Sequence, residues 1–125
     1  MPPTEEQVTA TVQRYLATFS ANDREGWLDC FTEDGTVEDP VGSEVRKGRE
    51  SIGEFWDQSH TLADAITLHL VQGPGGAGDE YAFAMEAHAE IGGNKMIVPT
   101  IDVMTFADDG RITGQRAFWA TPVPG

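Results

Sequence analysis

The order of apolar and polar positions divides the chain into a helical first half and a second half with strand periodicity. Thr4 and Gln7 form a capping box, after which apolar side chains recur at helical spacing. The residues of this stripe are Val8, Val12, Tyr15, Leu16 and Phe19. The pattern predicts a first helix from about Glu5 to Ala21.

Two further helices are predicted before the middle of the chain. Asn22 and Glu25 form a second capping box, which begins a short helix that ends at Asp34-Gly35. A third helix begins at Gly48-Arg49-Glu50 and fades by His60. Their apolar faces consist of Trp27, Leu28 and Phe31 in the second helix, and of Ile52, Phe55 and Trp56 in the third.

The apolar period changes to two in the second half of the chain, which indicates strands with one buried face. A short strand is also predicted before Pro40, which has no backbone N–H to donate. The predicted strands are 36–39, 66–70, 83–91, 95–106 and 111–119. Helices followed by such a meander predict an α+β fold, in which three N-terminal helices pack on a curved, mostly antiparallel sheet. A sheet of this shape with helices across its mouth encloses a pocket.

Two segments resemble binding motifs but lack the context that those motifs need. Residues 73–78 satisfy the G-x-G-x-x-G pattern, yet strand periodicity follows them where a dinucleotide site needs a helix. We expect a hairpin loop there. Glu86, His88 and Glu90 share one strand face, but the outer two are about 13 Å apart along the strand. We therefore expect a solvated face and no metal site.

The length, net charge and cysteine content of the chain limit the number of domains and the kinds of molecule that it can bind. A chain of 125 residues can bury one core, so we expect a single domain over residues 1–125. Its formal net charge of −13 repels phosphate backbones and anionic lipid headgroups, so we expect neither nucleic acid nor a membrane as partner. No basic leader and no long apolar run occurs, which favours a cytoplasmic protein. Cys30, the only cysteine, excludes an intramolecular disulfide.

Three polar residues occupy positions where the periodicity predicts an apolar face: Tyr15, Asp39 and Asp102. Tyr15 lies within the stripe of the first helix, so its hydroxyl must find a partner or a ligand. Asp39 shares one face of a short strand with Val37. Asp102 lies in the apolar run 96–104, and that run contains no Lys or Arg that could pair with it. Its carboxyl is expected to be neutral and able to donate a hydrogen bond, unless it is paired.

Each of these residues also has a purely structural interpretation. Tyr15 is then bonded to a backbone carbonyl, Asp39 belongs to an exposed turn, and Asp102 accepts from backbone amides at a bulge. Taken together, however, they supply an ionised carboxylate as base and two neutral oxygen donors. That set suits enolisation, in which a proton is removed beside a carbonyl and an oxyanion develops.

A family resemblance rests on four segments: Thr36-Val-Glu-Asp-Pro-Val-Gly, Lys47-Gly-Arg-Glu-Ser-Ile, Ile101-Asp-Val-Met-Thr-Phe, and Asp109-Gly-Arg-Ile ending at Trp119. From Val8 to Trp119 the chain resembles the bacterial ketosteroid isomerases of the NTF2-like (SnoaL-like) superfamily. The resemblance implies an NTF2-like cone, with Asp39 as base and Tyr15 and Asp102 as oxyanion donors, an arrangement for which ketosteroid isomerase is the standard example. It also implies that a β,γ double bond of a 3-oxosteroid moves into conjugation without cofactor or metal.

The substrate implied by the resemblance is small, hydrophobic and steroid-like. We expect its pocket to include Phe31, Trp56, Met85, Ala87 and Trp119. Phe31 and Trp56 occupy positions where the family often has tyrosines that support the oxyanion-hole tyrosine, and neither supplies a hydroxyl. A homodimer is expected because Ile101 and Val103 make the outer sheet face apolar as well. The alternatives are a SnoaL-like polyketide cyclase and a non-catalytic NTF2-like ligand-binding module.

Overall fold

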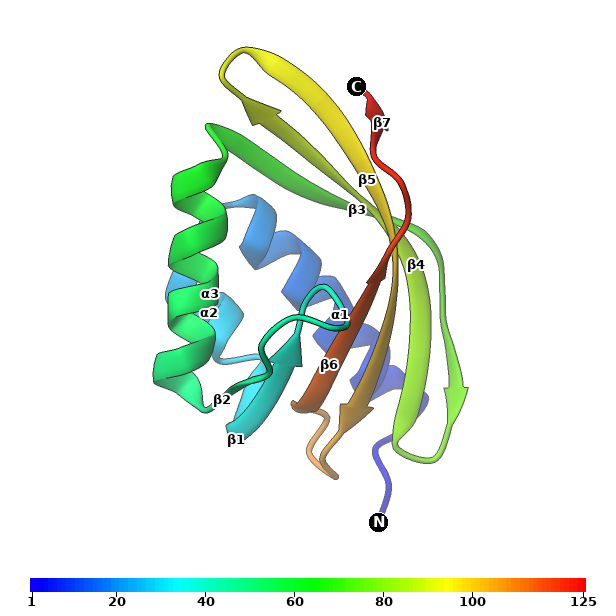
Figure 1. Ribbon diagram of the computed structural model, residues 1–125. Coiled ribbons are helices and arrows are strands. Elements are labelled where there is room, and N and C mark those ends of the chain that lie inside the picture. The colour runs from blue at the N-terminus through cyan, green and yellow to red at the C-terminus, as the bar shows by residue number, and fades with distance from the viewer.

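The computed structural model describes the whole chain, residues 1–125, as a layer of helices against a curved sheet (Figure 1). The helices are α1 (Glu5–Ser20), α2 (Arg24–Leu28) and α3 (Arg49–Leu62). The strands are β1 (Phe31–Glu38), β2 (Arg46–Lys47), β3 (Ala65–Ala77), β4 (Glu80–Ile91), β5 (Asn94–Phe106), β6 (Ile112–Trp119) and β7 (Val123–Pro124). This confirms the predicted α+β architecture.

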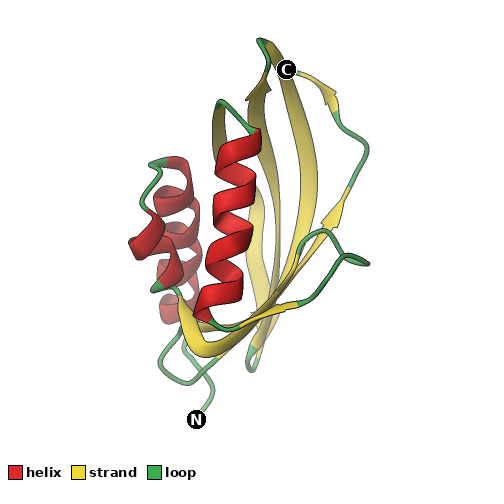
Figure 2. Cartoon of the chain, turned by 60° about the vertical axis from the view of Figure 1, so that its left-hand side comes forward, coloured by secondary structure: helices red, strands yellow, loops and turns green.

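The seven strands form one sheet in the order β2-β1-β6-β5-β4-β3, and β7 pairs with β5. Only the pair β1–β6 is parallel, so the sheet is mostly antiparallel, as expected. All three helices lie on the same side of the sheet (Figure 2). The hydrophobic core fills the space between the two layers.

Helix α1 forms where the sequence pattern places it. Thr4 accepts from the backbone N–H of Gln7, and the Gln7 side chain accepts from the backbone N–H of Thr4, which confirms the capping box. The predicted apolar stripe is buried, Tyr15 included. No helix in the structure combines the length and the apolar character that crossing a membrane would require.

The second predicted capping box is wrong. Asp23 is the N-cap of α2, and its carboxylate accepts from the backbone N–H of Gly26 at 3.0 Å. Asn22 instead has a left-handed backbone with φ of 59°. Asparagine tolerates this conformation, so Asn22 turns the chain between the two helices and leaves the capping role to its neighbour.

The predicted end of the second helix is also wrong. Helix α2 ends at Leu28, and Phe31 already begins β1. Asp34 and Gly35 therefore lie within a strand. A register shift against β6 between Phe31 and Thr36 accommodates them as an irregularity of the strand.

Residues 73–77 of the glycine-rich segment belong to a strand, so the predicted hairpin loop is wrong for them and holds only for Gly78. Strand β3 extends to Ala77 and pairs with β4, for example Gly76 with Tyr81. A Cβ atom at Gly76 would lie only 2.7 Å from the Cα atom of Tyr81, so only glycine fits this close approach. The turn itself falls at Gly78 and Asp79, and no helix follows it.

Candidate active site

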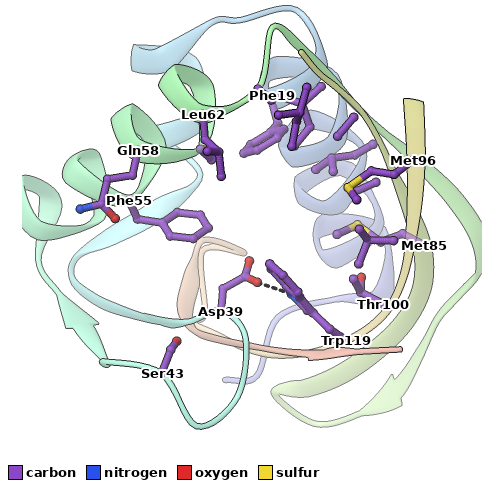
Figure 3. A pocket seen from close by; sticks show the side chains of 18 of the residues that line it. Phe19, Asp39, Ser43, Phe55, Gln58, Leu62, Met85, Met96, Thr100 and Trp119 are labelled. Carbon is purple, nitrogen blue, oxygen red and sulfur yellow. Dashed lines mark hydrogen bonds between the residues drawn. The ribbon is translucent and has the colours of Figure 1, made fainter. Parts of the chain in front are cut away.

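A cavity of about 470 Å³ lies between the helices and the concave face of the sheet (Figure 3). Of the 21 residues that line it, 14 are hydrophobic. The remaining residues are polar, and two sets of polar groups matter for the chemistry of the cavity. Tyr15, Asp39 and Thr100 belong to one group, and Arg46 and Gln58 lie together elsewhere on the wall, joined by a hydrogen bond of 2.8 Å. A mostly apolar cavity with a few polar groups is typical of a site for a small hydrophobic ligand.

The sheet register explains why residues far apart in sequence meet at this cavity. Strand β6 lies between β1 and β5, with Gln115 beside Val37 on one side and Ala117 beside Asp102 on the other. Asp39 follows Val37 by two residues, so it projects from the same face. The small Ala117 side chain leaves the space between the two aspartates open to the side chain of Gln115.

Tyr15 points from α1 toward this part of the sheet. Its side chain is buried, and its hydroxyl oxygen lies 3.3 Å from Nε2 of Gln115. Burial holds the pKa of Tyr15 well above its usual value, and the negative charges of Asp102 and Asp39 act in the same direction. The phenol therefore stays protonated and can donate a hydrogen bond.

Asp39 lines the cavity, whereas its neighbour Glu38 turns away and accepts from Arg116 at 2.9 Å. Nε1 of Trp119 donates to Oδ1 of Asp39 at 2.6 Å (Figure 3). Nε2 of Gln115 lies 3.4 Å from the other oxygen. Burial raises the pKa of Asp39, and the two hydrogen bonds oppose that effect by favouring the charged form.

Asp102 is completely buried, and its two carboxyl oxygens have different donors. The Thr100 hydroxyl donates to Oδ1 at 2.9 Å, and Gln115 Nε2 donates to Oδ2 at 2.8 Å. Burial raises the pKa of Asp102 to about 7, with a further contribution from the charge of Asp39, while the two hydrogen bonds lower it. Near neutral pH, a substantial share of Asp102 is therefore the neutral acid.

Gln115 is the site residue that the sequence reasoning missed. Its Nε2 atom lies within 3.4 Å of oxygens from Tyr15, Asp39 and Asp102, so the three side chains converge on this one nitrogen. The available signal was its position in the last long strand. Gln115 alternates with the exposed Arg116, which places a polar side chain on the buried face.

The residues predicted to contact a substrate fall into two groups. Met85, Ala87 and Trp119 line the cavity. Phe31 and Trp56 are buried in the hydrophobic core and are absent from the cavity wall. Phe31 nevertheless packs edge-on against the Tyr15 ring, with centroids 6.2 Å apart.

Trp27, which the sequence reasoning did not single out, packs against Tyr15 more closely than Phe31 does. The ring centroids are 5.7 Å apart. Its indole nitrogen is buried without a well-aligned acceptor, and it acts to lower the pKa of Tyr15. Trp56 instead stacks on His60 and packs against Trp27. The indole beside the phenol thus comes from α2 and not from α3.

A cavity with this chemistry supports proton transfer next to a developing oxyanion. Asp39 and the phenol of Tyr15 lie on the wall of an apolar pocket, and the carboxyl of Asp102 is buried behind that wall, next to Thr100 and Gln115. The fold and this site define the class of protein. The sequence model of the SnoaL-like domain matches residues 12–115, and the chain belongs to this family of NTF2-like proteins.

Within that family, the chain is similar to a steroid Delta-isomerase of Nocardioides simplex. The two are 37% identical over 114 residues, which cover 91% of this chain and 90% of the relative. This moderate identity makes the protein a homologue of a steroid delta-isomerase.

Solved structures of related proteins have the same fold. RV0760c from Mycobacterium tuberculosis superposes with a TM-score of 0.85 at 27% identity, over 98% of each chain. A second structure of RV0760c, in complex with estradiol-17beta-hemisuccinate, gives a TM-score of 0.80 at 27% identity over 91% of this chain and 94% of the other. SalBIII, an epoxide hydrolase/cyclase-like enzyme with a role in pyran ring formation in salinomycin, gives 0.83 at 27% identity over 94% and 93%.

Proposed function

We propose that the protein is a steroid delta-isomerase that moves a β,γ double bond of a 3-oxosteroid into conjugation. The observation that supports this most strongly is the convergence of Tyr15, Asp39 and Asp102 on one point beside an apolar cavity. The similarity to a curated steroid Delta-isomerase supports the same reaction class.

In the proposed reaction, Asp39 is the base. Its carboxylate takes a proton from the carbon between the ketone and the isolated double bond, and the electron pair of the broken C–H bond forms a dienolate. Tyr15 and neutral Asp102 donate hydrogen bonds to the dienolate oxygen. Asp39 then returns the same proton two carbons further along, so the enzyme ends in its starting state. Such a step needs no external reductant, oxidant or cofactor.

The cavity supports a flat polycyclic ketone as substrate. The apolar part of its wall includes aliphatic and thioether side chains on α3, β3, β4 and β5, among them Leu62, Leu68, Met85, Met96 and Val98. Ala87 and Ala89 on β4 are small and widen the pocket at that position. The similarity to SalBIII supports the second candidate, a cyclase in which Asp39 acts as acid or base on a different ring system.

The first experiment measures turnover. Purified protein without added metal or cofactor is mixed with a β,γ-unsaturated 3-oxosteroid, and growth of the conjugated enone absorbance is followed. We expect Asp39→Asn to lose turnover by about 10² to 10⁴-fold, the range usual for removal of a general base. The same variant should still bind a phenolic steroid, whose oxygen resembles that of the dienolate. Asp108→Asn, in an exposed turn, is the matched control and should retain full activity.

Three outcomes separate the alternatives. Turnover no faster than in acetate buffer at saturating steroid would exclude the isomerase. Binding of the phenolic steroid without any turnover would favour a ligand-binding module or an enzyme with another substrate. Equal loss of binding and turnover in Asp39→Asn would make Asp39 a structural residue.

A further inference from the structure

The proposed reaction leaves one buried polar side chain in the site without a role. Gln115 is 1% exposed, and its Nε2 atom is surrounded by three oxygens, one from each of the proposed catalytic residues. Its Oε1 atom is also buried, and no protein group donates to it. Burying an amide whose nitrogen is hydrogen-bonded but whose oxygen has no donor costs free energy of folding. Such a group calls for a functional explanation.

The position of this amide conflicts with that of the proposed ligand oxygen. An oxygen that accepts from both Tyr15 and Asp102 must lie about 2.6–3.0 Å from each of their donor atoms. Nε2 of Gln115 already lies 3.3 Å from the Tyr15 hydroxyl and 2.8 Å from Oδ2 of Asp102. Asp102 is absent from the cavity wall, and the amide nitrogen lies between its Oδ2 atom and the Tyr15 hydroxyl. A ligand oxygen that enters from the cavity therefore reaches both donors only if the Gln115 side chain moves.

We propose that Gln115 is a positioning residue whose side-chain nitrogen holds the place of the ligand oxygen, keeps Tyr15, Asp39 and Asp102 aligned, and is displaced on binding. This inference rests on the proposed function, because it assumes a ligand with a hydrogen-bond-accepting oxygen. The residue acts through the side chains that it aligns and makes no contact with the reacting carbon atoms.

The displacement changes the electrostatics of Asp102. The titratable groups that act on it are Asp39, at the end of β1, and Tyr15, from α1. Strand β4 places Phe83 beside it and β6 places Ala117 beside it, and no Lys or Arg forms an ion pair with it. Gln115 and Thr100 are therefore the groups that favour its ionised form.

Loss of the hydrogen bond from Gln115 changes the pKa of Asp102 in a definite direction. A hydrogen bond to the charged form lowers the pKa of a carboxyl, so removing that bond raises the pKa. A ligand oxygen that replaces the amide accepts instead of donating, which favours the neutral acid further. Near and above pH 7, Asp102 is at least partly ionised in the free protein. Binding of such a ligand is then coupled to the uptake of a proton by Asp102 from solution.

The decisive variant is Gln115→Met, because methionine has a similar length and no N–H donor. We expect the pKa of Asp102 to rise by about one unit from its wild-type value. The pKa is read from a carboxyl-carbon NMR titration, with Asp102→Asn used to assign the signal. Affinity for a phenolic steroid should increase at least about threefold, since the methionine side chain makes none of the hydrogen bonds that have to be broken before the glutamine moves. Gln13→Met, on the exposed face of α1, is the matched control and should change neither quantity.

A second variant guards against misfolding. If Gln115→Met does not give a folded protein, Gln115→Leu removes the same donor and is measured in the same way. An unchanged or lowered pKa of Asp102, or weaker binding of the phenol by a folded variant, would overturn the role of Gln115. Absence of turnover in the wild type together with the raised pKa would count against the isomerase and not against this role.

Discussion

Asp39 and Asp102 have the same side chain and different surroundings. Asp39 lines the cavity and accepts from the exposed Trp119, whereas Asp102 is sealed behind Thr100 and Gln115. Burial raises the pKa of both carboxyls, and that of Asp102 reaches about 7. Two carboxyls with such different surroundings suit two roles, a base that meets the substrate and an acid that donates a hydrogen bond.

The two proposed oxyanion donors, Tyr15 and Asp102, lead to a prediction about single residues. Neither Phe31 nor Trp56 offers Tyr15 a hydroxyl, so in the proposed mechanism we expect its phenol to be less polarised and Asp102 to carry the larger share of the oxyanion. We expect Asp102→Ala to reduce turnover more than Tyr15→Phe does, with losses on the order of 10² to 10³-fold for a donor of this kind. The measurement is kcat for both variants on one steroid.

Phe31→Tyr is the companion variant. The Phe31 ring lies edge-on to Tyr15, so a hydroxyl added there that reaches the phenol should leave turnover unchanged or raise it. If Tyr15→Phe proved clearly more damaging than Asp102→Ala, Tyr15 would dominate without a hydroxyl partner. The indole of Trp27, which packs against the phenol, would then be the group that supports it.

Among the elements, α2 and β1 position Asp39, the proposed base. Helix α2 has only five residues, so its own hydrogen bonds cannot hold it, and its buried Trp27 and Leu28 anchor it to the core. The early end of α2 lets β1 begin at Phe31 and run in parallel beside β6. That pairing brings Asp39 to the same end of the sheet as Gln115.

The cap of α2 is testable. Asp23→Ala removes the side chain that accepts from the backbone N–H of Gly26, so we expect the free energy of unfolding to fall by about 1 kcal/mol. Asn22→Gly keeps the left-handed backbone and should change the stability by a few tenths of a kcal/mol at most. Urea denaturation of both variants gives the comparison. A larger loss in Asn22→Gly would return the capping role to Asn22.

The whole molecule combines a strong negative charge with apolar side chains on the outer face of its sheet. The net charge is −13. Ile101 and Phe118 are cross-strand partners on β5 and β6, and they are 55% and 40% exposed. Adjacent exposed apolar side chains of this size favour association, whereas the charge of two copies opposes it.

We therefore predict a homodimer whose stability increases with salt. Ile101→Glu places a charge in the exposed apolar pair and should shift the protein to monomer, while Glu5→Gln at the start of α1 is a control that should not. Sedimentation equilibrium at low and at about 0.15 M ionic strength measures both effects, because salt screens the repulsion between copies. A wild-type protein that stays monomeric at both ionic strengths would contradict this prediction.

The local pattern of the sequence was sufficient for the elements whose own residues determine them. The capping box and the apolar stripe of α1 predicted its bounds to within one residue, and alternation predicted β4 and the inward face that carries Met85. It failed at α2, β1 and the end of β3. There, pairing with a neighbouring strand overrides the local preference of Asp34, Gly35 and the glycine-rich segment.

The residues of the site likewise fall into those that the sequence predicted and one that only the tertiary structure places there. Periodicity alone placed Tyr15, Asp39 and Asp102 on inward faces, because each is polar within an apolar pattern. Only the tertiary structure shows that Gln115 lies between them. Residues 39, 102 and 115 meet because β6 pairs in parallel with β1 and antiparallel with β5, and that register depends on hydrogen bonds between segments far apart in the chain.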